Sequence, residues 1–271
     1  MRASAPAKIN LALVVGPLRH DGKHELLTVY QRIGIADRID VVPAEHTRVD
    51  GFTNDTLVRN ALELLAAHAA VDRHWHAKIE KHIPVAGGLG GGSSDAATAL
   101  ALANGMLEEP LPHEELHDVA AEVGSDVPFF LVPGPRLGSG DGTMLAPLDL
   151  PQDFWILLVL PKHARKESTA SVYAAFDERK GADGWDDRRN ALLDALDLVR
   201  RPRDLAALPV NDLASSPLAD ELTALGAFRA DVSGAGPIVY GLFHHEAQAK
   251  AAKRAFHRAG RTWLTAPAWY G

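Results

Sequence analysis

The decisive stretch of this sequence is Pro84-Val85-Ala86-Gly87-Gly88-Leu89-Gly90-Gly91-Gly92-Ser93-Ser94-Asp95, which places five glycines between a predicted strand and a predicted helix. Because glycine has no Cβ, the backbone can adopt positive φ and bring several N–H groups close to phosphate oxygens. The unpaired N–H groups and the dipole of the first helical turn add to the attraction for an anion. The stretch therefore predicts a phosphate-binding loop that leads into a helix.

Two common glycine-rich phosphate loops differ from this stretch. A P-loop requires a lysine after its last glycine, where this chain has Ser93, and the dinucleotide fingerprint fails because Gly88-x-Gly90 leads to Ser93. A nucleotide would therefore be held in another way. Ser93 and Ser94 can contact phosphate or metal, or can cap the helix. The alternative is a flexible turn without a ligand, but ordering five glycines is costly in entropy.

The composition is that of an ordinary globular protein, with 46% hydrophobic and 23% charged residues. At 271 residues the chain exceeds the size that one core usually serves, so we expect two domains or one domain with a deep cleft. Mixed strands and helices indicate α+β layers rather than regular βαβ winding. We place the boundary between residues 1–148 and residues 149–271.

Charge and cysteine content exclude several classes of partner and chemistry. A formal net charge of -7 argues against a general affinity for nucleic acid, which needs a surface rich in Lys and Arg. The absence of cysteine excludes disulfides, thiol nucleophiles and cysteine-based metal sites. No apolar run approaches the roughly 20 residues of a membrane span, and the first residues lack a secretory signal. We therefore expect a cytoplasmic protein with a small-molecule substrate. The sequence does not indicate an oligomeric state.

Period-two alternation predicts the strands near the start of the chain. Apolar residues alternate along residues 7–15 and predict a half-buried strand, with Lys8 and Asn10 on its other face. The apolar positions on the shared face are Ile9, Leu11, Leu13 and Val15. Further strands are predicted at residues 26–35 and 38–42, which together give a β-meander.

Helical spacing and short apolar runs predict the other elements. Helices are expected at residues 57–70, 94–104, 114–123, 188–200, 217–225 and 246–259. Strands are expected at residues 77–85, 127–132, 154–160, 228–232 and 238–243. A second glycine loop, Ser233-Gly234-Ala235-Gly236-Pro237, lies between the last two strands.

The first glycine loop resembles the phosphate loop of the GHMP kinase superfamily through Pro84-x-x-x-Gly88-Leu89-Gly90-Gly91-Gly92-Ser93-Ser94. Four further segments resemble, within that superfamily, the kinases of 4-diphosphocytidyl-2-C-methyl-D-erythritol. In chain order they are residues 7–11, residues 21–26, residues 124–130 and residues 233–237. The resemblance runs in order across almost the whole chain.

The resemblance implies a fold, a reaction and a catalytic pair. The fold is the two-domain α+β GHMP kinase fold, with a cleft between an N-terminal ATP-binding, catalytic domain and a C-terminal substrate-binding domain. The reaction phosphorylates the 2-hydroxyl of the cytidyl substrate with ATP and Mg²⁺, in the non-mevalonate route to isoprenoids. Asp126 corresponds to the catalytic base and Lys8 to its partner. This fits the chemistry, because an alcohol needs a carboxylate to accept its proton during phosphoryl transfer.

The resemblance also implies the binding residues. The nucleotide phosphates would contact Pro84, Ala86, Gly87, Gly88, Leu89, Gly90, Gly91, Gly92, Ser93 and Ser94. The substrate would contact Asn10, Lys23, His24, Asp126, Thr169, Tyr173, Gly234 and Ala235, with His24 at the cytosine edge. No side chain is assigned to Mg²⁺, because phosphates and waters supply most of its ligands.

Three positions depart from the pattern of the family. Lys23 stands where the family usually has a tyrosine that stacks on the base, which leaves Tyr173 as the stacking residue. The stem of a lysine can still cover a ring, and its ammonium can approach a diphosphate. Thr56 stands where an asparagine is common near the adenine pocket, and Asn54 is a candidate substitute. Ala235 replaces a serine but keeps its backbone N–H.

Other interpretations remain open from the residues alone. Without the resemblance, Lys8 would be an ordinary solvent-facing lysine and His24 a surface histidine, and Asp126 could be an aspartate that caps a turn. A second kinase hypothesis is a homoserine-type or mevalonate-type GHMP kinase, against which the Asp21-Gly22-x-His24 segment argues. A third hypothesis is a nucleotide-binding regulator without catalysis. The histidines at residues 68–82 are predicted to be surface residues.

Overall fold

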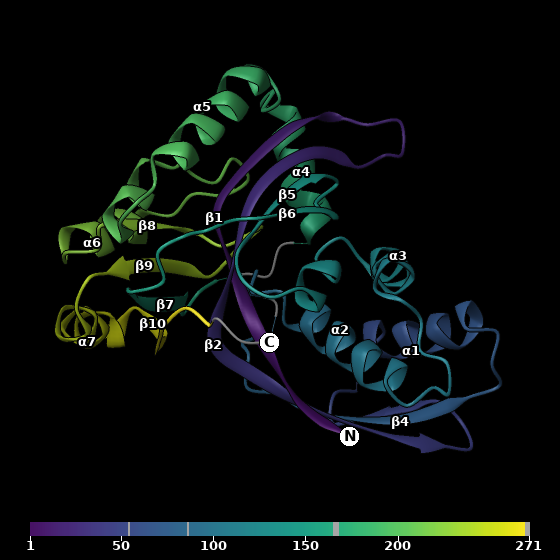
Figure 1. Cartoon of the computed structure of the whole chain (residues 1–271). Helices are drawn as coiled ribbons and strands as arrows, with labels where there is room; N and C mark the ends of the chain where they lie inside the picture. Colours follow the sequence, from purple (N-terminus) through teal and green to yellow (C-terminus); the bar gives the residue numbers. More distant parts are fainter. Residues whose placement is uncertain (54, 86, 165–167, 269–271) are drawn as a thin grey trace.

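The computed structural model describes residues 1–53, 55–85, 87–164 and 168–268. These residues form two β-sheets with helices packed on them, so the predicted α+β architecture is confirmed (Figure 1). Within the same ranges, no helix combines the length and the apolar character that crossing a bilayer requires.

The larger sheet is built on a long antiparallel hairpin of β1 (Arg2–Leu18) and β2 (His24–Ala44). The sheet has six strands, with β1 beside β2 and the remaining order β3-β4-β2-β5-β6. The outer strands are β3 (Arg48–Asp50), β4 (His74–Glu80), β5 (Arg136–Gly140) and β6 (Met144–Pro147). The predicted β-meander is wrong, because Ala36 and Asp37 keep pairing with β1 and join the two predicted strands into β2.

A bulge in β1 changes which face each side chain occupies. The register of its pairing with β2 shifts between Asn10 and Ala12. One extra residue inverts the alternation that follows it, so the predicted apolar positions do not share one face. Ile9 and Leu11 lie in one core cluster, and Leu13 and Val15 lie in another. The strand is also not half-buried, since Lys8 and Asn10 are each only 3% exposed.

Three helices accompany the larger sheet: α1 (Leu57–His68), α2 (Gly91–Asn104) and α3 (His113–Val123). α1 and α2 pack on the sheet, and α3 packs against both of them. The helices predicted at residues 57–70 and 114–123 are confirmed. α2 begins at Gly91 rather than at Ser94, so the last glycines of the decisive stretch are already helical.

One strand predicted in this half is wrong, and another is confirmed with different bounds. Residues 127–132 form η1 (Pro128–Leu131), a short 3-10 helix, because Pro128 lacks an N–H for a sheet and its fixed φ suits a first helical turn. The periodicity of such a short apolar run does not distinguish a strand from a helical turn. The strand predicted over residues 77–85 ends at Glu80, and Val85 is exposed.

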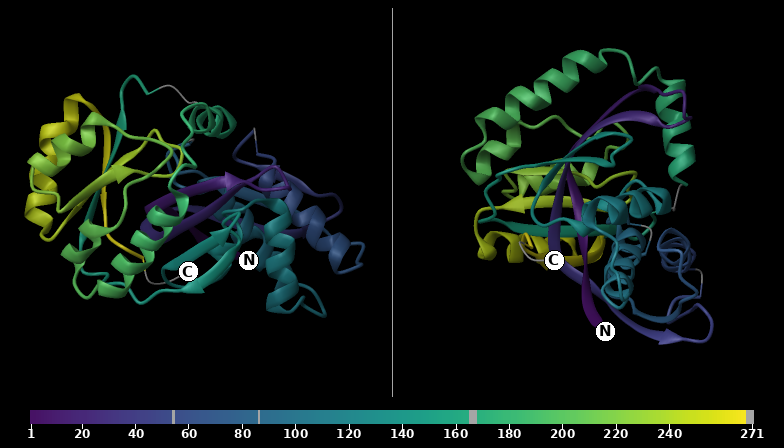
Figure 2. Two further views of the ribbon diagram at one scale, coloured as in Figure 1. Left: turned by 90° about the horizontal axis from the view of Figure 1, so that it is seen from above. Right: turned by 45° about the vertical axis from the view of Figure 1, so that its right-hand side comes forward.

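The smaller sheet has four antiparallel strands in the order β10-β7-β9-β8. They are β7 (Trp155–Pro161), β8 (Arg229–Val232), β9 (Val239–Phe243) and β10 (Gly260–Thr265). The helices of this half are α4 (Thr169–Glu178), α5 (Trp185–Leu198), α6 (Pro217–Ala224) and α7 (Glu246–Ala255), with η2 (Pro202–Ala207) and η3 (Phe256–Arg258). α6 and α7 cover one face of the sheet, and the long hairpin lies against the other (Figures 1 and 2).

The predicted domain boundary falls between β6 and β7, where the chain passes from the larger sheet to the smaller one. Core residues of both sheets nevertheless share one cluster, which includes Ile9 of β1, Ile156 of β7 and Tyr240 of β9. The division at residues 148 and 149 therefore stays a prediction.

Candidate active site

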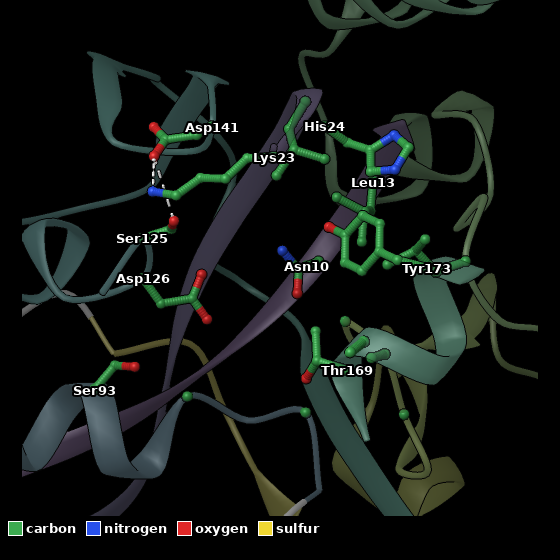
Figure 3. Close-up of a pocket in the computed structure, with 18 of the residues that line it drawn as sticks. Asn10, Leu13, Lys23, His24, Ser93, Ser125, Asp126, Asp141, Thr169 and Tyr173 are labelled. Carbon is green, nitrogen blue, oxygen red and sulfur yellow. Dashed lines mark hydrogen bonds and ion pairs between the residues drawn. The ribbon is translucent and has the colours of Figure 1, made fainter. Parts of the chain in front are cut away.

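A cavity of about 770 Å³ brings segments from both halves of the chain together. Every residue that the sequence assigned to the substrate lines this cavity, although they come from β1, β2, α4 and three connecting segments (Figure 3). They are Asn10, Lys23, His24, Asp126, Thr169, Tyr173, Gly234 and Ala235.

The two glycine loops pack directly against each other at the floor of the cavity. Gly88 has a φ of +77°, and a Cβ at this position would lie 2.1 Å from the carbonyl oxygen of Ser233. The Ser233 hydroxyl donates to the Gly88 carbonyl at 2.9 Å, and the N–H of Ile238 donates to Gly87 O at 3.3 Å. The conformation of the phosphate loop therefore depends on the second half of the chain.

The predicted phosphate residues divide into those that reach the cavity and those that support the loop. Gly88, Gly90 and Ser93 line the cavity. Leu89 is buried, and its carbonyl accepts the N–H of Lys8 at 2.9 Å. The other described members, which are Pro84, Gly87, Gly91, Gly92 and Ser94, are not part of the wall. Ala86 lies outside the described residues.

Lys8 and Asp126, which the family resemblance pairs, both line the cavity and contact each other. The Nζ of Lys8 lies 3.3 Å from Oδ2 of Asp126 and donates to Oδ1 of Asn10 at 2.6 Å. The Asn10 amide donates in turn to the Thr28 hydroxyl at 2.8 Å. This chain of contacts fixes a buried ammonium beside a carboxylate that is 31% exposed, so the carboxylate remains accessible to a ligand.

Tyr30 also contacts this pair, and the sequence did not single it out. Its hydroxyl donates to Oδ1 of Asp126 at 3.0 Å, and Lys8 Nζ lies 5.5 Å from the centre of its ring. Burial raises the pKa of Tyr30 well above its ordinary value, and the charge of Asp126 raises it further. Alternation along β2 was the missed signal, because it places Thr28 and Tyr30 on the same face as His24.

His24 and Tyr173 form an aromatic pair at one end of the cavity. Their rings stack with centroids 5.1 Å apart and planes inclined by 25°. His24 Nδ1 lies 2.9 Å from the Gly16 carbonyl, which can only accept, so this nitrogen carries a proton. Nε2 lies 3.3 Å from Asp177. Burial raises the pKa of Tyr173 to about 12, with the charge of Asp126 adding to the effect.

Lys23 forms an ion pair with Asp141 at the cavity rim, which connects the β1–β2 turn to the β5–β6 turn (Figure 3). The Lys23 Nζ lies 2.5 Å from Oδ2 of Asp141, and the hydroxyl of Thr143 donates to the other carboxylate oxygen at 2.7 Å. Although partial burial raises the pKa of Asp141, the hydrogen bonds from Lys23 and Thr143 bring it to about 2. Asp141 is therefore a carboxylate, and the sequence did not predict its place at the cavity.

A buried cluster behind the phosphate loop connects three segments of the first half. The ammonium of Lys81 bridges Asp37 of β2 at 2.5 Å and Asp95 of α2 at 2.8 Å. The other oxygen of Asp37 accepts the N–H of Ile83 at 2.8 Å. Burial raises the pKa of Asp95, against the opposing effect of Lys81. The cluster holds the chain in place before and after the phosphate loop. The sequence did not predict it.

The departures from the family pattern occupy different places. Lys23 and Ala235 both line the cavity. Thr56 is the residue before α1 and makes no capping hydrogen bond with its side chain; Asp55 accepts the N–H of Val58 at 3.1 Å instead. Asn54 lies outside the described residues.

Comparison with known families defines the class of the protein. The model of the GHMP kinases N terminal domain matches residues 56–134, and that of the GHMP kinases C terminal matches residues 196–262. The structure of the Methanococcus jannaschii mevalonate kinase has the same fold, with a TM-score of 0.76 at 14% identity over 99% of this chain and 98% of that one. The class is therefore that of the ATP-dependent GHMP kinases.

Relatives with higher sequence identity define the family within this class. A 4-diphosphocytidyl-2-C-methyl-D-erythritol kinase of Desulfitobacterium hafniense is 37% identical over 276 residues, which cover 96% of this chain and 93% of the relative. That of Gloeobacter violaceus is 36% identical over 269 residues, covering 93% and 88%. The crystal structure of a 4-(cytidine 5'-diphospho)-2C-methyl-D-erythritol kinase has a TM-score of 0.79 at 29% identity, over 100% of both chains. The chain belongs to the GHMP kinases and, within them, to the 4-diphosphocytidyl-2-C-methyl-D-erythritol kinase family.

Proposed function

We propose that this kinase phosphorylates the 2-hydroxyl of 4-diphosphocytidyl-2-C-methyl-D-erythritol, in the non-mevalonate (methylerythritol phosphate) route to isoprenoid precursors. Relatives of that name at 36–37% identity support the substrate. One observation in the structure carries the reaction: Lys8 and Asp126, 3.3 Å apart, line the same cavity as Gly88 and Ser93 of the phosphate loop.

In the proposed reaction Asp126 acts as the general base. The substrate hydroxyl gives its proton to the carboxylate, and its oxygen forms a bond to the γ-phosphorus of ATP. The bond between that phosphorus and the oxygen bridging to the β-phosphate breaks, and ADP leaves. Lys8 balances the charge of Asp126 and of the phosphoryl group in transfer.

The phosphates of ATP would lie on the glycine loop at the start of α2. Gly88, Gly90 and Ser93 line the cavity there, and a helical N-terminus attracts negative charge. Within the described ranges, no three His, Cys, Asp or Glu side chains group to hold a metal by themselves. Mg²⁺ would be bound mainly by phosphate and water oxygens, and the Ser93 hydroxyl is one protein oxygen that lines the cavity beside the loop.

The cytidine end of the substrate would lie against His24 and Tyr173. The aromatic face of Tyr173 offers stacking. Nε2 of His24, which lies 3.3 Å from Asp177, would give up that contact to hydrogen-bond the base. Asn10, Thr169, Gly234 and Ala235 complete the wall around the remainder of the substrate. Lys23 would approach the diphosphate, because its ammonium has three donors and the pair with Asp141 uses one of them.

Replacing Lys23 with alanine tests that contact. We expect KM for the cytidyl substrate to rise about two- to fivefold, since an exposed charge contributes little more than this. KM for ATP should not change, because the loop that holds the phosphates is intact. The matched control is Lys250→Ala, which removes another exposed lysine from an ion pair of 2.9 Å with Glu246 on α7. Equal KM values for the substrate in both variants would contradict a diphosphate contact.

The function itself is tested by ADP release with ATP, Mg²⁺ and the cytidyl substrate, in parallel with homoserine and mevalonate. Turnover confined to the cytidyl compound is the expected result. Turnover of homoserine or mevalonate alone would assign the protein to another GHMP activity. If ATP binds and no alcohol reacts, the protein is a nucleotide-binding regulator rather than a kinase.

A further inference from the structure

Tyr30 is the one tyrosine whose described contacts include both members of the proposed catalytic pair. Its hydroxyl lies 3.0 Å from Oδ1 of Asp126, and the Lys8 ammonium lies 5.5 Å from its ring centre. The side chain projects from β2 directly opposite Asn10 in the register with β1. Tyr30 therefore contacts both residues of the Lys8–Asp126 ion pair.

The neighbouring hairpin of β5 and β6 packs closely against the Tyr30 ring at two glycines. A Cβ at Gly138 of β5 would lie 2.6 Å from the Tyr30 ring, and a Cβ at Gly142 would lie 2.9 Å from its hydroxyl. On the other side, the ring stacks on Phe129 with centroids 4.8 Å apart. Tyr30 is only 2% exposed, so its hydroxyl has a fixed position relative to Asp126.

The direction of the hydrogen bond follows from the chemistry of the two groups. Burial raises the pKa of Tyr30 well above its ordinary value, so the hydroxyl is protonated at neutral pH and is the donor. The donated bond occupies Oδ1 of Asp126. The other oxygen, Oδ2, is the one that lies 3.3 Å from Lys8. The two oxygens of one carboxylate are thus held in different environments.

We propose that Tyr30 is a positioning residue, which fixes the orientation of the Asp126 carboxylate and leaves Oδ2 as the oxygen that takes the proton of the substrate. The inference rests on the proposed role of Asp126.

Other charged and titratable groups face Asp126 from the surrounding elements. Lys8 comes from β1, Tyr173 from α4, and the Lys23–Asp141 pair from the two turns at the rim. Removing the hydroxyl of Tyr30 leaves these groups in place. A change in kcat of that variant therefore reports on the lost hydrogen bond.

The test is Tyr30→Phe, which keeps the ring and removes the donor. We expect kcat to fall about tenfold while both KM values stay within about twofold, because substrate binding does not use this bond. The values of kcat/KM should fall by about the same factor as kcat, because the loss lies in the chemical step rather than in substrate binding.

The control is Tyr240→Phe, which removes another fully buried tyrosine hydroxyl, bonded to the Asn10 carbonyl at 3.0 Å. This variant should lose stability while kcat stays within about twofold of the wild type. If Tyr30→Phe retains the wild-type kcat, or changes only as Tyr240→Phe does, Tyr30 is a packing residue and the inference is wrong. Failure of the proposed function is distinguishable, because Asp126→Asn would then remain active.

Discussion

Asp126→Asn is expected to lower kcat for ADP release with the cytidyl substrate at least about a thousandfold, because an amide cannot accept the proton of the alcohol. The side chain keeps its shape, and its amide oxygen can still accept the Tyr30 hydroxyl at the 3.0 Å of the wild type. Lys8 loses its partner carboxylate while it remains buried, so the free energy of unfolding should fall by about 1–3 kcal/mol. ATP binding should persist.

The measurement combines single-turnover ADP release with thermal unfolding and ATP titration of the same protein. The matched control is Asp118→Asn, the same change at a position of α3 whose side chain is 78% exposed. That control should behave as the wild type in all three measurements. A folded Asp126→Asn protein that retains a tenth or more of the wild-type kcat would remove Asp126 as the base.

Gly88→Ala is expected to destabilise the protein by about 2–4 kcal/mol and to raise KM for ATP at least about tenfold. The new Cβ would lie 2.1 Å from the Ser233 carbonyl oxygen, and alanine is also disfavoured at a φ of +77°. The two glycine loops must separate to admit the methyl group. The N–H groups that the first loop presents to phosphate then lose their arrangement.

The control for this variant is Gly226→Ala. Gly226 has a φ of +98°, but a Cβ added there would have nothing within 4 Å, so the change reports the backbone cost without a collision. We expect about 1–2 kcal/mol in urea unfolding for this change, with unaltered KM for ATP. Equal losses of stability in the two variants would show that the packing of the loops is not what requires glycine at position 88.

The sequence predicts those parts of the molecule whose chemistry is local. The glycine loop is recognisable because several glycines before a helix start form a local sequence pattern, although the packing of the loop against Ser233 is not local. The helices at residues 57–70 and 217–225 correspond to α1 and α6, because their apolar spacing lies within the segment and the capping residues Asp55 and Ser216 lie just before it. Lys8 and Asp126 were placed by resemblance to a family, and the structure brings them together.

The missed features depend on contacts between distant residues. Tyr30 and Asp126 are separated by 96 positions, and Lys23 and Asp141 by 118, so no local pattern connects them. The bulge in β1 likewise arises from its pairing with β2 rather than from its own composition. A prediction that follows alternation alone assumes a regular ladder, and it fails wherever one strand has an extra residue.

The bulge changes which positions of β1 face the cavity, from even-numbered residues before it to odd-numbered residues after it. Before it, the even-numbered Lys8 and Asn10 line the cavity, and after it the odd-numbered Leu13 does so. Deleting Leu11 would keep all three on the cavity side, because it removes the extra residue itself. Deleting Ile9 would instead set Lys8 and Asn10 on opposite faces. The number of residues between Lys8 and Asn10 is therefore constrained, as well as the identity of these two residues.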